Sequence, residues 1–265
     1  MAIRMLVTDL DGTLLNRSFQ ISPKNKEALQ AAAAKGVMVT LATGRMYRSA
    51  RPYAVELGLD APIITYNGAV IQSTGGETLF SSCLEAGTAA AVMQYCFQRR
   101  WYVQLYQGDN LYYAAATPAA LAYEKSSGVK GLAVGQKGML ARTTAAPKLL
   151  AVAPDPSRTD AMVAELAEVF SGKIAVMKSN PLYIEVIAPG VSKAAAMLSL
   201  AAEYGIRADE IMALGDSNND LSMLRAAGLG IAMGNAAESV QQIADAVTTD
   251  CESGGVADAV YRYVL

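Results

Sequence analysis

The residues best suited to chemistry are acidic and lie in two clusters, one near each end of the chain. Asp9 and Asp11 follow one short apolar run, and Asp216 and Asp220 follow another. The 265-residue sequence contains no histidine, which removes the commonest general base, the commonest metal ligand and every Ser-His or Cys-His catalytic pair. Any catalysis must therefore use carboxylates, lysine, hydroxyl groups or a metal held by oxygen.

Alternating strands and helices are expected to position these acids in the first part of the chain. A buried strand is predicted at Met5 to Thr8, and Ser22 followed by Pro23 predicts the start of a helix that ends at Lys35-Gly36. The pattern then predicts a strand at Val37 to Ala42, a helix through about Leu57 and a strand at Ile63 to Tyr66. This alternation is typical of a parallel sheet with helices on both faces.

A different rhythm begins after the turn-forming pair Asn67-Gly68, and the segment from about Cys83 is richer in tyrosine. Here the expected elements are helices at Glu85 to Arg99, Pro118 to Lys125 and Arg158 to Phe170, with strands at Trp101 to Tyr106, Leu111 to Tyr113, Lys148 to Ala153, Ile174 to Met177 and Leu182 to Ile187. From Val191 the alternation resumes, with helices at Ser192 to Tyr204, Asn219 to Ala226, Ala237 to Ile243 and after Gly255, and strands at Ile211 to Leu214, Leu229 to Ala232 and Ala246 to Thr248. The sequence thus predicts an α/β core domain from residues 1–82 and 188–265, interrupted by an inserted α+β domain at 83–187.

Three strand ends of the predicted core carry reactive groups. Open parallel sheets bind ligands at the carboxyl ends of their strands, and these ends carry Asp9 with Asp11, Thr43 with Gly44, and the run from Asp216. Carboxylates crowded at buried strand ends repel one another and lose hydration, and a hard cation relieves both costs. Mg²⁺ is the expected cofactor because it prefers oxygen ligands and keeps waters that a phosphate can replace.

Four motifs in order resemble the haloacid dehalogenase (HAD) superfamily of phosphotransferases. They are Asp9-Leu10-Asp11-Gly12-Thr13, Thr43-Gly44-Arg45, Lys193 in Val-Ser-Lys, and Gly215-Asp216-Ser217-Asn218-Asn219-Asp220. Three further runs resemble the Cof-type (subclass IIB) branch: Asn67-Gly68, Met233-Gly234-Asn235-Ala236 and Glu252-Ser253-Gly254-Gly255-Val256. The resemblance implies a Rossmann-like core with an α+β cap domain of the C2B type, inserted between the second and third motifs.

The resemblance also implies catalytic roles. Asp9 would be the nucleophile, since a carboxylate can attack phosphorus without first losing a proton. Asp11 would protonate the leaving group and then activate water, a general acid-base contribution of about 10² to 10⁴-fold. Asp9, the backbone carbonyl of Asp11 and Asp216 would hold the metal. Asp220 would orient these ligands without binding the metal itself. The phosphoryl oxygens would be bound by Thr43, the amides of Leu10 and Gly44, Lys193 and Asn219.

The function expected from these assignments is a Mg²⁺-dependent phosphatase. It would hydrolyse small phosphorylated metabolites, such as sugar phosphates or cofactor phosphates, through a phosphoryl-aspartate intermediate. One alternative is a phosphomutase, which uses the same pair of aspartates but returns the phosphoryl group to the sugar. Another is a catalytically silent protein that binds a phosphorylated metabolite, although such a protein has no need of Asp11.

Single motifs also have structural interpretations. Asp-Gly-Thr after an apolar run is often only a turn, and Thr43-Gly44 could be a corner between a strand and a helix. Lys193 could be a solvated helix residue, and Asp216 or Ser217 could simply cap a helix. Four such coincidences in the family's order would be required to explain the pattern without catalysis.

Composition excludes several other functional classes. The formal charge is −2, from 22 basic and 24 acidic residues, and no basic run resembles a site for a nucleic acid polymer. Charged residues, Gly or Pro interrupt every apolar run before about 18 residues, so no membrane span is expected. The N-terminus has no apolar stretch of a signal peptide, and the three cysteines form no C-x-x-C pair. A soluble cytoplasmic protein that acts on a small phosphorylated metabolite is expected.

Overall fold

Two units, each built on its own β-sheet, make up residues 2–265, the part of the chain that the computed structural model describes. The first, called the core unit, contains residues 2–44, Ala50–Phe80 and Ser192–Leu265. The second, called the inserted unit, contains Arg45–Ser49 and Ser81–Val191. The chain therefore contributes to the inserted unit twice, briefly at Arg45–Ser49 and then through the long segment Ser81–Val191, before it returns to the core unit.

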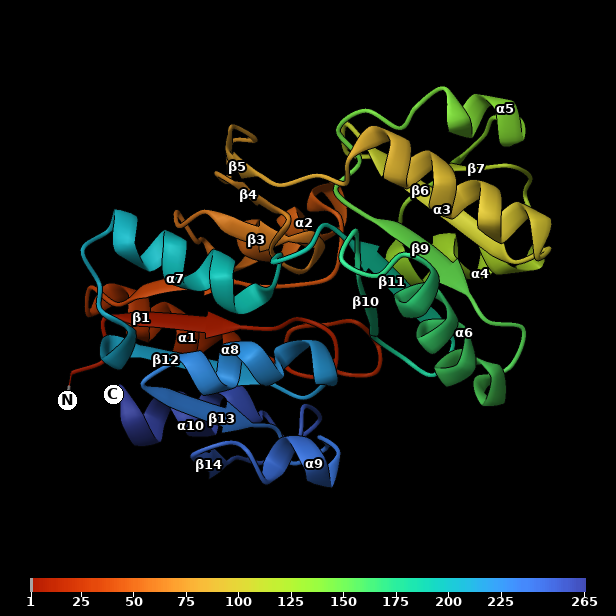
Figure 1. The fold of residues 1–265 in the computed structure, drawn as a ribbon. Helices are drawn as coiled ribbons and strands as arrows, with labels where there is room; N and C mark the ends of the chain where they lie inside the picture. Colours follow the sequence, from red (N-terminus) through yellow and green to blue (C-terminus); the bar gives the residue numbers. More distant parts are fainter. Residues whose placement is uncertain (1) are drawn as a thin grey trace. The chain divides into compact units, whose positions relative to one another are not determined.

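A five-stranded parallel sheet forms the centre of the core unit (Figure 1). Its strands, in spatial order, are β14 (Ala246–Val247), β13 (Leu229–Ala232), β12 (Ile211–Gly215), β1 (Met5–Thr8) and β2 (Met38–Leu41). Thr8, the last residue of β1, pairs with Leu214 on one side and Leu41 on the other. The carboxyl ends of these three strands therefore lie side by side, and Asp9 is the first residue beyond the central one.

A smaller three-stranded sheet adjoins β2 through one bridge between Ala42 and Ile64. It consists of β3 (Ile63–Thr65), β4 (Val70–Gln72) and β5 (Thr78–Ser81). The antiparallel strands β3 and β4 are joined by the short 3₁₀ turn η1 (Tyr66–Gly68). This is the position at which the Asn67-Gly68 pair predicts a turn.

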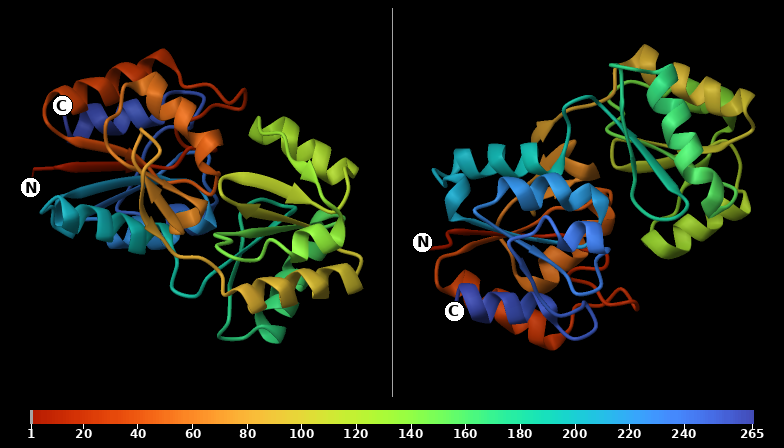
Figure 2. Two further views of the ribbon diagram at one scale, coloured as in Figure 1. Left: turned by 90° about the horizontal axis from the view of Figure 1, so that it is seen from above. Right: turned by 60° about the horizontal axis from the view of Figure 1, so that its bottom comes forward.

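Helices cover both faces of the parallel sheet (Figure 2). The neighbouring helices α1 (Pro23–Ala34) and α10 (Gly255–Tyr263) pack on one face, while α7 (Lys193–Glu203) and α8 (Leu221–Ala226) pack on the other. The core unit also contains α9 (Glu238–Gln241), η2 (Ala208–Glu210) and η3 (Asn218–Asp220), and α2 (Tyr47–Leu57) spans the boundary of the two units. Serine side chains cap the starts of α1 and α7, where Ser22 accepts a hydrogen bond from the amide of Asn25 and Ser192 one from the amide of Ala195.

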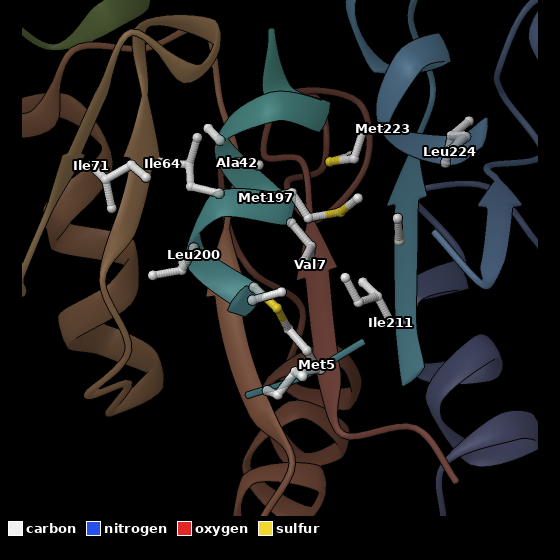
Figure 3. Packing of buried hydrophobic residues seen from close by; sticks show 14 of the residues in the cluster. Met5, Val7, Ala42, Ile64, Ile71, Met197, Leu200, Ile211, Met223 and Leu224 are labelled. Atoms are coloured by element: carbon white, nitrogen blue, oxygen red, sulfur yellow. The ribbon is translucent and has the colours of Figure 1, made fainter. Parts of the chain in front are cut away.

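Helix α7 is held against the sheet by a buried apolar cluster. Figure 3 shows Met197 of α7 next to Val7 of β1, with Ile211 of β12 near them, while Leu200 lies on the other side of the helix within the same cluster. Met223 and Leu224 of α8 belong to the same cluster. This packing fixes α7 along β1 and thereby sets the position of its first residue, Lys193.

The inserted unit contains a six-stranded sheet. The strands, in spatial order, are β10 (Ala175–Lys178), β11 (Tyr183–Ile187), β9 (Leu149–Val152), β6 (Tyr102–Gln107), β7 (Asn110–Tyr113) and β8 (Leu132–Ala133). All neighbours are antiparallel except β7 and β8. Its helices are α3 (Ala86–Gln98), α4 (Pro118–Ser127), α5 (Gly135–Leu140) and α6 (Pro156–Val169), and a second apolar core includes residues of α3 and α6 packed with strands of this sheet.

The expected α/β fold with an additional α+β unit is confirmed. Some local elements differ from the prediction. The sequence pattern does not predict β5, β8 or α5, and it places a helix at Asn219 where η3 precedes α8. Strand β8 has only two residues, both exposed, and α5 has no side-chain cap and contains Gly138. Among residues 2–265, no helix combines the length and the apolar character needed to cross a membrane.

Truncation of Met197 tests the packing of α7. Met197→Ala should lower the free energy of unfolding by about 2–5 kcal/mol, because it leaves a cavity in a buried cluster. Leu198→Ala, on the same helix but 38% exposed, should cost less than about 1 kcal/mol. Urea denaturation of the two variants measures the difference, and equal losses would contradict the described packing.

Candidate active site

The centre of the candidate site is the buried side chain of Lys193. Its Nζ lies 2.6 Å from Oδ1 of Asp9 and 2.7 Å from Oδ1 of Asp220, and it is fully shielded from solvent. Burial lowers the pKa of Lys193, but the two carboxylates outweigh burial and hold this pKa above its ordinary value. The lysine is therefore a permanent positive charge between two acids from different parts of the sheet.

Asp220 uses both of its carboxylate oxygens within the protein. One accepts from Lys193, and the other accepts from the backbone amides of Asp216 and Ser217, each at 3.0 Å. Asp220 is fully buried. It lies so close to Gly215 that a Cβ added to Gly215 would be 2.5 Å from the Cβ of Asp220. Asp220 thus fixes the loop after β12 and the lysine at the same time.

Asp216 is held by hydroxyl groups. Its Oδ1 accepts from Thr13 Oγ1 and its Oδ2 from Ser217 Oγ, both at 3.0 Å. Burial and the neighbouring charge of Asp220 raise the pKa of Asp216 to about 6. Gly12 lies directly against this carboxylate, because a Cβ on Gly12 would be 2.5 Å from Asp216 Oδ2.

The acids form an all-oxygen cluster that fits a hard divalent cation. Asp9, Asp216 and Asp220 each contribute one carboxylate oxygen to a group in which all three lie within 4.8 Å of one another. Burial raises the pKa of Asp9 well above its ordinary value, Lys193 opposes this shift, and the neighbouring acids add to it. A bound cation would relieve both the burial and the repulsion. Asp220 is already committed to Lys193 and two amides, so Asp9 and Asp216 are the stronger candidates for direct ligands.

The remaining residues expected in the site lie at the same sheet edge or close to it. Leu10 is fully buried, and its carbonyl accepts from the amide of Leu15 at 2.8 Å. Thr43 is buried one residue beyond Ala42, and its amide donates to the carbonyl of Ile64 at 2.9 Å; Gly44 follows it as the last residue of that core segment. Asp11 is exposed and its carboxylate does not belong to the three-acid cluster.

Asn219 lies in the turn between Asp216 and Asp220, the two acids of the fourth motif. Its Nδ2 donates to Oδ1 of Asn67 at 3.1 Å, and its own Oδ1 is buried with no hydrogen-bond partner within residues 2–265. The sequence pattern predicts Asn67 only as a turn residue. The contact of Asn67 with Asn219 depends on the tertiary structure. The one sequence signal that pointed to Asn67 was its place in the Asn-Gly pair of the Cof-type branch.

Comparisons with known proteins show which family the chain belongs to. Residues 6–260 match the family model described as haloacid dehalogenase-like hydrolase. The chain belongs to this family. It is 30% identical over 264 residues to the 5-amino-6-(5-phospho-D-ribitylamino)uracil phosphatase YcsE of Bacillus subtilis (strain 168), covering 99% of this chain and 96% of the relative.

Solved structures of the family share the fold. A haloacid dehalogenase-like hydrolase from Bacteroides thetaiotaomicron is 29% identical with a TM-score of 0.87, over 98% of this chain and 99% of that one. The HAD subclass IIB sugar phosphatase BT4131 is 25% identical with a TM-score of 0.85, over 98% of each chain. The predictions of the HAD family, its Cof-type branch and an enzyme of the phosphatase type are therefore confirmed.

Substitution of Gly12 tests its close approach to Asp216. Gly12 and Gly36 both have positive φ, +79° and +83°, so alanine at either position should cost about 1 kcal/mol of stability. Only Gly12→Ala also places a Cβ against Asp216, whereas nothing lies within 4 Å of a Cβ at Gly36. Gly12→Ala should therefore reduce phosphatase activity at least about tenfold by displacing the carboxylate, and Gly36→Ala should leave it unchanged.

The measurement is kcat/KM on one phosphate monoester together with the thermal midpoint of each variant. Equal activity in the two alanine variants would show that the position of Asp216 does not depend on Gly12.

Proposed function

We propose that this enzyme is a Mg²⁺-dependent phosphatase that transfers the phosphoryl group of a small phosphorylated metabolite to Asp9 and then to water. The observation that carries the proposal is the contact of Lys193 with Asp9 inside the three-acid cluster. A buried ammonium at 2.6 Å from one carboxylate oxygen orients that carboxylate and supplies positive charge where a phosphoryl group would bind.

In the first step, a carboxylate oxygen of Asp9 forms a bond to phosphorus while the bond from phosphorus to the ester oxygen breaks. The electron pair of the broken bond goes to the leaving alkoxide, and Asp11 donates a proton to it. An alcohol leaves, and the phosphoryl group is carried on Asp9 as an acyl phosphate. The exposure of Asp11 suits this role, because the residue must exchange its proton with the leaving group and with solvent.

In the second step, water attacks the phosphorus of the acyl phosphate. Asp11 now accepts a proton from the water, and the bond between phosphorus and the Asp9 oxygen breaks. Inorganic phosphate is released and the carboxylate of Asp9 is regenerated. Asp11 is protonated at the start of the first step and ionised at the start of the second, so the two steps require no other general acid or base.

The phosphoryl oxygens need positive charge and hydrogen-bond donors in both steps. We assign Lys193, the hydroxyl of Thr43, the amides of Leu10 and Gly44, and the side chain of Asn219 to this binding. Mg²⁺, held by Asp9, Asp216 and the carbonyl of Asp11, would supply the additional charge that stabilises the transferring group. Asp220 would support this arrangement through Lys193 and the backbone of the β12 loop.

We assign the choice of substrate to an inserted cap domain, expected at residues 83–187. A relative acts on a phosphorylated ribityl compound, and another is a sugar phosphatase, by their names. These names support a phosphate monoester of a sugar, a sugar alcohol or a cofactor precursor as the substrate class. The cytoplasm, where such metabolites occur, is the proposed location.

Removal of the nucleophile tests the covalent step. Asp9→Asn preserves the shape of the side chain but weakens its nucleophilicity, so turnover should fall by at least about 10³-fold. Release of inorganic phosphate from a panel of sugar, nucleotide and cofactor phosphates measures it. Asp60→Asn, at an exposed position of the core unit, is the matched control and should behave like wild type. Wild-type turnover by Asp9→Asn would refute the nucleophile assignment.

Chelation tests the metal assignment. EDTA should abolish phosphate release, and Mg²⁺ should restore it, because the cluster lacks enough positive charge without a cation. Asp216→Asn should raise the Mg²⁺ concentration for half-maximal activity at least about tenfold. Activity that is indifferent to EDTA, or an Asp216→Asn variant with the wild-type Mg²⁺ requirement, would contradict the assignment.

A further inference from the structure

The η1 turn beside the candidate site has an unusual backbone. Tyr66, Asn67 and Gly68 are consecutive, and all three have positive φ angles, of 52°, 57° and 100°. Tyr66 and Asn67 are nevertheless 2% and 1% exposed. Positive φ is costly for residues other than glycine, and such conformations persist where surrounding structure enforces them, often at functional sites.

Asn67 connects two elements of the proposed phosphate site. Its backbone amide donates to the carbonyl of Thr43, two residues beyond β2, at 2.9 Å. Its side-chain Oδ1 accepts from Nδ2 of Asn219 at 3.1 Å, in the turn after β12. Asn67 therefore holds one hydrogen bond to each of two residues assigned to the phosphoryl oxygens.

Gly68 brings the same turn against a third element. A Cβ at Gly68 would lie 2.2 Å from the carbonyl oxygen of Ser192, the residue that caps α7. The next residue is Lys193. The turn is thus in van der Waals contact with the start of the helix that delivers the lysine.

The amide group of Asn219 can serve two partners. A side-chain NH₂ has two donor positions, and the contact with Asn67 uses one of them. The second is then available to a phosphoryl oxygen. Without an acceptor at residue 67, the Asn219 side chain would lose the hydrogen bond that fixes its rotation.

We propose that Asn67 is a positioning residue for phosphoryl transfer, which acts by holding the side-chain amide of Asn219 toward the phosphoryl group. The inference rests on the proposed function, because it assigns a role within that reaction. Asn67 itself makes no bond to the substrate in this role. Its effect on the rate passes through Asn219.

A double-mutant cycle separates this role from a purely structural one. Asn67→Gly removes the side chain while it keeps a residue that adopts positive φ, and it should lower kcat/KM about tenfold. Asn219→Ala should lower it at least as much. If Asn67 acts through Asn219, the double variant should be no slower than Asn219→Ala alone.

Arg100→Gly is the matched control, because Arg100 is an exposed residue with a φ of 58° in the inserted unit. The Arg100→Gly variant should retain wild-type kcat/KM. That result would show that placing glycine at a position with positive φ does not by itself change catalysis. The thermal midpoint of each variant, measured alongside, shows whether a loss of activity comes from a loss of the fold.

Binding of inorganic phosphate gives a second readout. The inhibition constant of phosphate should rise by a similar factor in Asn67→Gly and Asn219→Ala, with no further rise in the double variant. Additive losses in either readout, or wild-type values in Asn67→Gly, would overturn the role of Asn67 and leave the proposed function intact. A wild-type enzyme that hydrolyses no phosphate monoester would overturn both.

Discussion

The structure of the site depends on one buried positive charge shared by two carboxylates. Lys193 contacts Asp9 and Asp220 within hydrogen-bond distance, and all three side chains are almost completely removed from solvent. Each of these charges would be too costly to bury alone. The positive charge of Lys193 and the negative charges of the two carboxylates stabilise one another. Asp216 adds a third acid to the cluster, so one ammonium faces three carboxyl groups. This excess of acidic groups is the reason that we propose a divalent cation at the site.

The fold supplies this arrangement through strand order and helix placement. The adjacent strands β1 and β12 end side by side, so the residues that follow them meet although they are far apart in sequence. Buried methionine and leucine side chains fix α7 over the same strands and bring its capped N-terminus to Asp9. Gly12 and Gly215 leave room for the acids to approach the backbone at distances that a Cβ would prevent. The glycines beside the acids and the packing of α7 therefore both determine where the side chains of Lys193, Asp216 and Asp220 lie.

Much of the core unit and its acids could be predicted from the sequence because the signals are local. The apolar run Met5–Thr8 and the Ser22-Pro23 pair mark a strand and a helix start that the structure places at the same residues. The two-residue strand β8 and the uncapped helix α5 lack such signals and depend on tertiary contacts. Asn67 shows the same limit within the site, since an Asn-Gly pair predicts a turn but does not reveal that its side chain meets Asn219.

The proposed mechanism requires that the phosphoryl group be transferred to Asp9 before it reaches water. The most direct measurement is the stereochemistry at phosphorus during hydrolysis of a monoester whose phosphate is made chiral with oxygen isotopes. Transfer to Asp9 and then to water consists of two in-line displacements, each with inversion, so we predict overall retention of configuration. Inversion would show a single direct attack by water and would contradict a covalent role for Asp9.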